Sequence, residues 1–191
     1  MRQMRKIGVV VTTPALALIV NIVADTPFAV AETIREATPI GETVATKISA
    51  FGAGASEYGA NTLYDVKITL LSVIRGDKAW NLIQVANAFN KPPEAKLEYI
   101  LARIRIACNS IGAPDIPYTV QPDNFKVYDT TNHAYEPPAV LAPEPALVGK
   151  VFHSGDVHEG WIPFLVAKDH NRPYIFYFGG LWFQLFESRN L

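Results

Sequence analysis

One stretch decides the fold: Leu63-Tyr64-Asp65-Val66-Lys67-Ile68-Thr69-Leu70-Leu71-Ser72-Val73-Ile74-Arg75. Its first half alternates strictly, with apolar side chains at 64, 66, 68 and 70 and polar ones between them. Alternation with a period of two is typical of a strand that is buried on one face. The phase changes at Leu70-Leu71, which predicts a bulge or an edge crossing at that point.

Short strand patterns separated by turn residues continue on both sides of this stretch. Seven further strands are predicted, over 43–49, 98–107, 124–128, 147–153, 160–167, 173–178 and 181–186. Gly179-Gly180 between the last two predicts a hairpin turn. About eight strands at this spacing favour an all-β fold, an immunoglobulin-like antiparallel β-sandwich. We expect one domain over 32–191, with its core at about 38–187.

Two segments depart from the strand pattern. Between Asp77 and Pro92 the apolar residues recur at helical spacing, which predicts one short helical insert over 77–90, laid across the end of a sheet. Its apolar positions are Ala79, Leu82, Ile83, Ala86 and Phe89. The segment 137–145 holds four prolines, which cannot lie in the centre of a sheet, so we expect it to cross between the two sheets.

The first 31 residues have the order of a secretory signal peptide. A basic start is followed by a largely apolar run over 7–24 and by Ala29-Val30-Ala31, whose small residues suit a signal peptidase. Cleavage after Ala31 would leave a secreted, extracellular protein. Retention of the segment would instead anchor the domain at the outer face of the membrane, although Pro14 and Asn21 interrupt the run.

The charge balance and the cysteine count exclude several classes of function. The chain has 17 basic and 18 acidic residues, and residues 32–191 keep 14 and 17 of them. This mildly acidic balance gives no footprint for nucleic acid and no polybasic lipid anchor. Cys108 is the only cysteine, so the fold has no internal disulfide. A buried free thiol is the favoured interpretation, since no neighbouring base marks a nucleophile.

Seven segments together carry a resemblance to a known family. They are Pro39-Ile40-Gly41-Glu42, Tyr64–Leu70, Arg75–Trp80, Glu98-Tyr99-Ile100, Phe125–Asp129, and the pair Gly160–Val166 with Pro173–Phe176. In them the chain resembles the telokin-like immunoglobulin-fold domains of unknown function found in exported bacterial and archaeal proteins. That group is similar in fold to a small immunoprotective extracellular protein. The resemblance covers nearly all of the chain after the signal segment. It implies an extracellular β-sandwich and no mapped catalytic residue.

One loop has the residue types of a metal site. His153, Asp156, His158 and Glu159 offer two imidazoles and two carboxylates within seven residues, a ligand set suited to zinc or another divalent ion. The spacing matches no established metal motif, so a solvated turn shaped by Gly155 is the alternative.

Aromatic residues crowd the last quarter of the chain and occupy both faces of its strands. One face must fill the core, and we expect the other, with Tyr177 and Trp182, to form an exposed partner-binding surface. Cover by the helix or by the N-terminal segment is the alternative.

No motif in the sequence fixes a reaction, and no cofactor is expected. The sequence therefore favours a non-catalytic binding or adhesion module acting on an unknown extracellular protein or surface ligand. A metal or small-molecule site in the 153–159 loop, or a structural envelope subunit joined by edge strands, are the alternatives.

Overall fold

The computed structural model describes residues 36–50, 62–111, 117–178 and 180–187 of the chain. The signal segment 1–31 lies outside these residues. The described part is an all-β, sandwich-like fold of antiparallel sheets with a single short helix, which confirms the fold class expected from the sequence. No described helix is both long and apolar enough to cross a bilayer.

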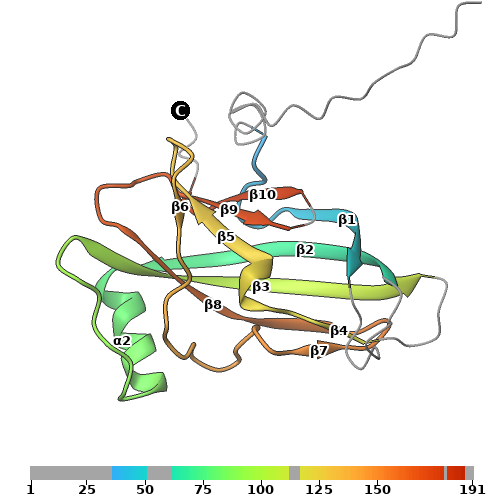
Figure 1. Ribbon diagram of the computed structural model, residues 1–191, viewed down its shortest axis with the longest axis horizontal. Coiled ribbons are helices and arrows are strands. Elements are labelled where there is room, and N and C mark those ends of the chain that lie inside the picture. The colour runs from blue at the N-terminus through green and yellow to red at the C-terminus, as the bar shows by residue number, and fades with distance from the viewer. Residues whose placement is uncertain (1–35, 51–61, 112–116, 179, 188–191) are drawn as a thin grey trace, which may run out of the picture.

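Four long strands form the first sheet (Figure 1). They are β1 (Thr43–Ala50), β2 (Thr62–Arg75), β3 (Leu97–Ile111) and β8 (Val157–Ala167), in the order β1-β2-β3-β8. The register of β2 on β3 shifts between Leu70 and Ser72, so the bulge predicted from the change of phase is present. The strand predicted over 98–107 is longer than expected, because β3 also pairs with β2 beyond Ala107.

Shorter strands form the second sheet and a small ribbon. The second sheet has the order β10-β9-β5-β6, made of β5 (Phe125–Tyr128), β6 (Ala134–Tyr135), β9 (Tyr174–Tyr177) and β10 (Leu181–Gln184). A 3-10 turn, η1 (Pro122–Asn124), precedes β5. The ribbon pairs β4 (Tyr118–Thr119) with β7 (Val151–Phe152), so the strand expected over 147–153 is only two residues long.

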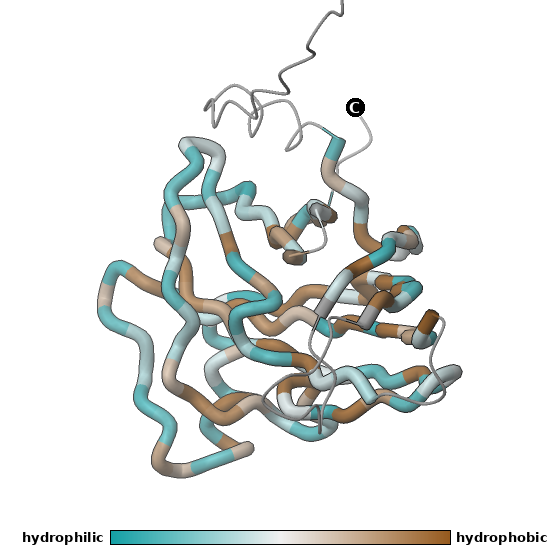
Figure 2. Tube along the Cα trace, turned by 45° about the vertical axis from the view of Figure 1, so that its right-hand side comes forward, coloured by the Kyte–Doolittle hydropathy of each residue, from teal (hydrophilic) through white to brown (hydrophobic). Residues whose placement is uncertain are grey.

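The core lies between the two sheets. The first sheet contributes the inward residues of its alternating strands, and the second contributes the inward rings of β5, β9 and β10. The fully buried members include Val66, Ile68, Ile100, Ile104, Ile106, Phe125, Ile175 and Phe183. Figure 2 shows apolar residues gathered along the strands, with hydrophilic residues in the outer loops. Burial of this apolar surface is the main stabilising term, since the only cysteine is free.

Helix α2 (Asp77–Ala86) packs on the outer face of the first sheet, near one end of β2 and β3 (Figure 1). Only Ala79 and Ile83 are buried, against Tyr99 and Leu101. The helix ends four residues earlier than predicted, because the backbone of Asn87 is extended; the N–H of Asn87 makes the last helical hydrogen bond, to the carbonyl of Ile83. It begins after Gly76, and no side chain caps its first turn.

Candidate binding groove

A proline-rich segment, residues 137–146, connects the second sheet to the edge of the first and is called the strap below. It follows β6 and reaches β8, where Ala146 forms a parallel bridge with Trp161. The predicted crossing between the sheets is therefore present. Because a proline has no backbone N–H and a fixed φ, four prolines keep this segment out of either sheet.

The side chain of Asn90 holds the strap beside helix α2. Its amide nitrogen donates to the carbonyl oxygen of Leu141 at 2.9 Å and to that of Ile83 at 2.7 Å. The backbone N–H of Leu141 donates to the amide oxygen of Asn90, also at 2.9 Å. One side chain thus satisfies both backbone groups of Leu141 and one carbonyl at the end of the helix.

Close backbone contact with β8 holds the far end of the strap. The N–H of Trp161 donates to the carbonyl of Pro145 at 2.8 Å, and the N–H of Leu147 donates to the carbonyl of Trp161 at 3.2 Å. A Cβ atom at Gly160 would lie 2.6 Å from the backbone nitrogen of Leu147. Only glycine allows this approach, so the strap is fixed at both of its ends.

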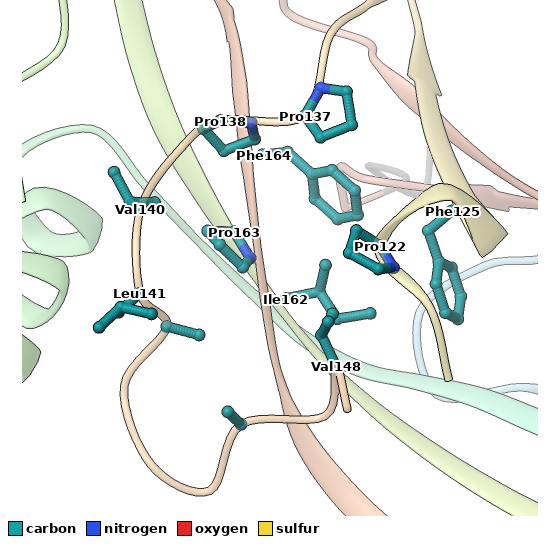
Figure 3. Close-up of a pocket in the computed structure, with 12 residues that line it drawn as sticks. Pro122, Phe125, Pro137, Pro138, Val140, Leu141, Val148, Ile162, Pro163 and Phe164 are labelled. Carbon is teal, nitrogen blue, oxygen red and sulfur yellow. The ribbon is translucent and has the colours of Figure 1, made fainter. Parts of the chain in front are cut away.

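Between these two anchors the strap bows away from β8 and leaves a cavity of about 200 Å³. Figure 3 shows side chains from the strap, β8 and the start of β5 converging on this space. Its lining is Pro122, Phe125, Pro137, Pro138, Val140, Leu141, Ala142, Ala146, Val148, Ile162, Pro163 and Phe164. All of these side chains are apolar. They supply no hydrogen-bonding or charged group, so the cavity suits an apolar occupant.

A second, more open hollow of about 430 Å³ lies between the strap and helix α2. It shares Leu141, Ala142 and Ala146 with the first cavity. Its other lining residues are Leu82, Val85, Ala86, Pro143 and Glu144. The two hollows together are called the apolar groove below, and Glu144 is the one charged residue in its lining.

Three large apolar side chains on the helix side of the groove project into solvent, two of them from its lining and the third, Phe89, from the segment that follows helix α2. Val85 is 86% exposed, Phe89 is 91% exposed and Leu141 is 63% exposed. Single exposed apolar residues are common, whereas several around an apolar hollow mark an interaction surface. These three residues are called the ridge below.

Sequence reasoning missed this site because it predicted a helix laid across the end of a sheet and did not ask which of its five apolar positions the sheet would leave uncovered. The structure buries Ala79 and Ile83, whereas Leu82, Ala86 and Phe89 are exposed. Five positions at this spacing cover a wider arc than the sheet can bury. Together with the apolar residues between the prolines, that surplus was the available signal.

The predicted metal ligands do not come together. Glu159 pairs with Arg103 and Arg105 on the outer face of the first sheet. The carboxylate of Asp156 accepts a hydrogen bond from the backbone N–H of His153 and lies 3.7 Å from Nε2 of His158.

Alternation along β8 accounts for this arrangement, because it sends the side chains of His158 and Glu159 to opposite faces. Among the described residues, no three His, Cys, Asp or Glu side chains are placed to hold one metal ion. The four-ligand site expected from the sequence is therefore not formed in the structure.

The predicted aromatic surface is half wrong. Tyr177 is fully buried, because its side chain faces inward from β9. Its hydroxyl and that of Tyr118 lie 3.2 Å apart and share a hydrogen bond. Trp182 is half-buried on the outer face of the second sheet. The centre of its ring lies 4.9 Å from that of Phe176 and 5.3 Å from that of Tyr128. Helix α2 lies on the other sheet, so it does not cover these rings.

Buried titratable groups near the core are held in their neutral forms. Burial raises the pKa of Cys108 to about 11, with a smaller contribution from the charge of Asp156. Burial also raises the pKa of Tyr118 to about 12, although its hydrogen bond with Tyr177 opposes the shift. A buried thiol with a raised pKa is unreactive, in agreement with the interpretation of Cys108 as a structural residue.

A polar cluster centred on Asp129 fastens the β5–β6 hairpin to the loop between β8 and β9. The buried carboxylate accepts hydrogen bonds from the backbone and hydroxyl of Thr131 and from the backbone of His133. It lies 3.6 Å from Nδ1 of His170, which the Tyr135 hydroxyl also contacts. No local sequence pattern marks this role of His170, because its partners come from segments far away in the sequence.

Comparison with known proteins adds little to this picture. No family model and no curated protein matches the chain. The ycdA lipoprotein candidate of Bacillus subtilis strain 168 is similar with a TM-score of 0.46 and 13% identity, over 77% of this chain and 40% of that one. The yjhA protein of Bacillus subtilis is similar with a TM-score of 0.40 and 16% identity, over 74% of this chain and 81% of that one.

The chain thus spans about two fifths of the length of the ycdA protein. Both likenesses are too weak to identify an activity or a partner.

Proposed function

We propose that this protein is an exported, non-catalytic binding module with an immunoglobulin-like sandwich, and that it binds a protein partner through the apolar groove and the ridge. The signal-like segment at 1–31 and the resemblance to exported telokin-like domains support export. The observation that carries the binding function is the apolar groove itself, whose cavity has only apolar side chains in its lining.

The chemistry of the groove argues against catalysis there. Acid–base or nucleophilic catalysis needs a titratable group or nucleophile beside the reacting atoms. The cavity lining supplies none, and Glu144 on the outer hollow already accepts a hydrogen bond from the backbone of Ala146 at 3.1 Å. The groove therefore supports recognition of an apolar group.

The ridge favours a protein over a free small molecule as the partner. A small ligand in the cavity would leave Val85 and Phe89 in water, since both project outside it. A protein surface can fill the groove with one side chain and cover the ridge with its neighbours. Interfaces of this kind place an apolar anchor in a pocket and surround it with contacts that exclude water.

The accessibility of the groove can be tested with a capped amino acid. N-acetyl-phenylalaninamide is titrated into the isotope-labelled Phe89→Ala protein, and backbone amide shifts are recorded by NMR. We expect saturable shifts confined to the strap, β8 and α2, with none from N-acetyl-glycinamide. Ala142→Phe fills the space shared by the two hollows and should abolish the shifts.

Shifts spread over the whole surface, or equal shifts in the Ala142→Phe variant, would refute binding in the groove.

Export is tested by intact-mass analysis of protein recovered from the cells and the medium. A mass for residues 32–191 in the medium supports export, whereas a full-length species confined to the cytoplasm contradicts it.

A further inference from the structure

The ridge and the groove are complementary features on one face of the same chain. Phe89 is the most exposed of the large apolar residues that the structure describes, at 91%. Its neighbour Asn90 bonds directly to the backbone of Leu141, which lines both hollows. The residue that carries the projecting phenyl ring is therefore next in sequence to one that is hydrogen-bonded to the wall of both hollows.

The sizes of the two features agree. An apolar cavity of about 150 Å³ is known to accept benzene. The cavity under the strap, of about 200 Å³, is large enough for one phenyl ring, and the open hollow beside helix α2 gives it access. Phe89 does not fill the groove of its own chain, because it points into solvent.

We infer that a second copy of this chain binds this face, with Phe89 of each copy entering the apolar groove of the other. A two-fold contact buries the same patch on both subunits, so a patch that contains both an anchor and a pocket is self-complementary. The inference rests on the proposed function, since it names the partner of the same groove. Val85 and Leu141 would lie around the anchor and exclude water from it.

The charges at the rim are compatible with such a contact. Lys78, one turn before Leu82 on α2, and Glu144 on the strap are both exposed. A rim of one sign would repel its own copy, whereas a rim with both signs lets Lys78 of one copy oppose Glu144 of the other. The patch thus has the apolar centre and polar rim of a specific interface.

Sedimentation equilibrium over a concentration series tests the inference on the full protein as recovered from expressing cells. We expect wild type to form a dimer and Phe89→Ala to weaken it by roughly a hundredfold, since each dimer loses two anchors. Phe178→Ala is the matched control, because Phe178 is also exposed but lies in the loop between β9 and β10. It should leave the dimer unchanged.

Mixing two defective variants tests the reciprocal geometry. Phe89→Ala lacks the anchor but keeps the groove, whereas Ala142→Phe keeps the anchor and fills the groove. Each variant alone should be largely monomeric, and an equimolar mixture should form a heterodimer through one intact contact. Far-UV circular dichroism and thermal unfolding verify that both variants are folded.

Three outcomes would overturn the inference. Wild-type protein that stays monomeric up to about 1 mM excludes the dimer. If the capped phenylalanine still binds the groove in that case, the proposed function stands and only the dimer is excluded. If that probe also fails to bind, both proposals fail. A dimer that survives both substitutions, or a mixture that forms no heterodimer, shows that this face is not the interface.

Discussion

At the scale of single residues, Gly160 determines where the strap can lie. Its backbone faces the strap so closely that a Cβ atom would meet three backbone atoms, from Pro145, Ala146 and Leu147, within 2.8 Å. Backbone atoms cannot turn aside as a flexible side chain can. The identity of this one residue therefore controls the packing of the strap on β8 and the shape of the cavity above it.

Replacing Gly160 with alanine should displace the strap. We expect a loss of about 1–3 kcal/mol in the free energy of unfolding, the usual cost of overpacking, measured by urea denaturation. NMR signals of the strap should also shift. Gly41→Ala is the comparison, because Gly41 has a φ of 92° and no atom within 4 Å of the added Cβ. The Gly41→Ala variant should lower stability through backbone strain and leave the NMR signals of the strap unchanged. Equal shifts of the strap signals in both variants would show that Gly160 does not control the position of the strap.

Single residues also show where sequence reasoning succeeds. The alternation in β2 predicted the buried side chains of its first half apart from Thr69, which is also buried, and the doubled leucine at 70–71 predicted the bulge. Both follow from local geometry, because a strand sends successive side chains to opposite faces. Tyr177 was predicted on the wrong face. In an aromatic run both faces carry rings, so alternation does not tell which set is buried.

At the scale of elements, helix α2 has two apolar faces with different roles. Ile83 faces the first sheet and is fully buried, whereas Val85 faces away and is 86% exposed. The sequence showed the helix and its apolar positions but not the width of the surface beneath it. That width depends on Tyr99 and Leu101, which β3 brings under the helix.

Alanine substitutions at these two positions should separate the faces. Ile83→Ala should lower the free energy of unfolding by about 2–4 kcal/mol, because it leaves a cavity between helix and sheet. Val85→Ala removes a side chain that is already in water and should change stability by less than about 0.5 kcal/mol. Both are measured by chemical denaturation of dilute protein. Similar losses at the two positions would show that the helix packs in another orientation.

The groove could not be predicted, because its walls come from elements that only the fold brings together. Four prolines at 137–145 correctly indicated a crossing between the sheets. No local pattern, however, specified where along β8 this segment would lie. The hydrogen bonds between Asn90 and Leu141 join residues 51 positions apart. The prediction of a metal site was wrong for the opposite reason. Its ligands are close in sequence, but the strand that carries His158 and Glu159 sends their side chains to opposite faces.

At the scale of the whole molecule, polar contacts at one end tie the two sheets together. Arg75, at the end of β2 in the first sheet, donates to the carbonyl of His170 at 2.9 Å. The ring of that histidine lies against Asp129 and Tyr135, which belong to the β5–β6 hairpin of the second sheet. Because no disulfide links the sheets, this cluster and the apolar core together hold the sandwich closed.

The charge of Asp129 makes this closure dependent on pH. Burial opposes ionisation of the carboxyl, but the hydrogen bonds from Thr131 and His133, together with nearby His170, outweigh it, so the pKa of Asp129 is lowered. A carboxyl whose pKa is lower in the folded than in the unfolded state adds stability above the unfolded pKa, about 3.9. That stability is lost as the pH falls through the folded pKa.

Asp129→Asn should therefore destabilise the protein most at neutral pH. We expect a loss of about 1.5–3 kcal/mol near pH 7, the size of hydrogen bonds to a charged group, and a smaller difference from wild type below about pH 4. Denaturation curves collected from pH 3 to pH 7 measure both. Asp65→Asn is the control, since this exposed residue lies in the middle of the first sheet. A difference from wild type that stays constant with pH would show that the charge of Asp129 does not stabilise the joined sheets.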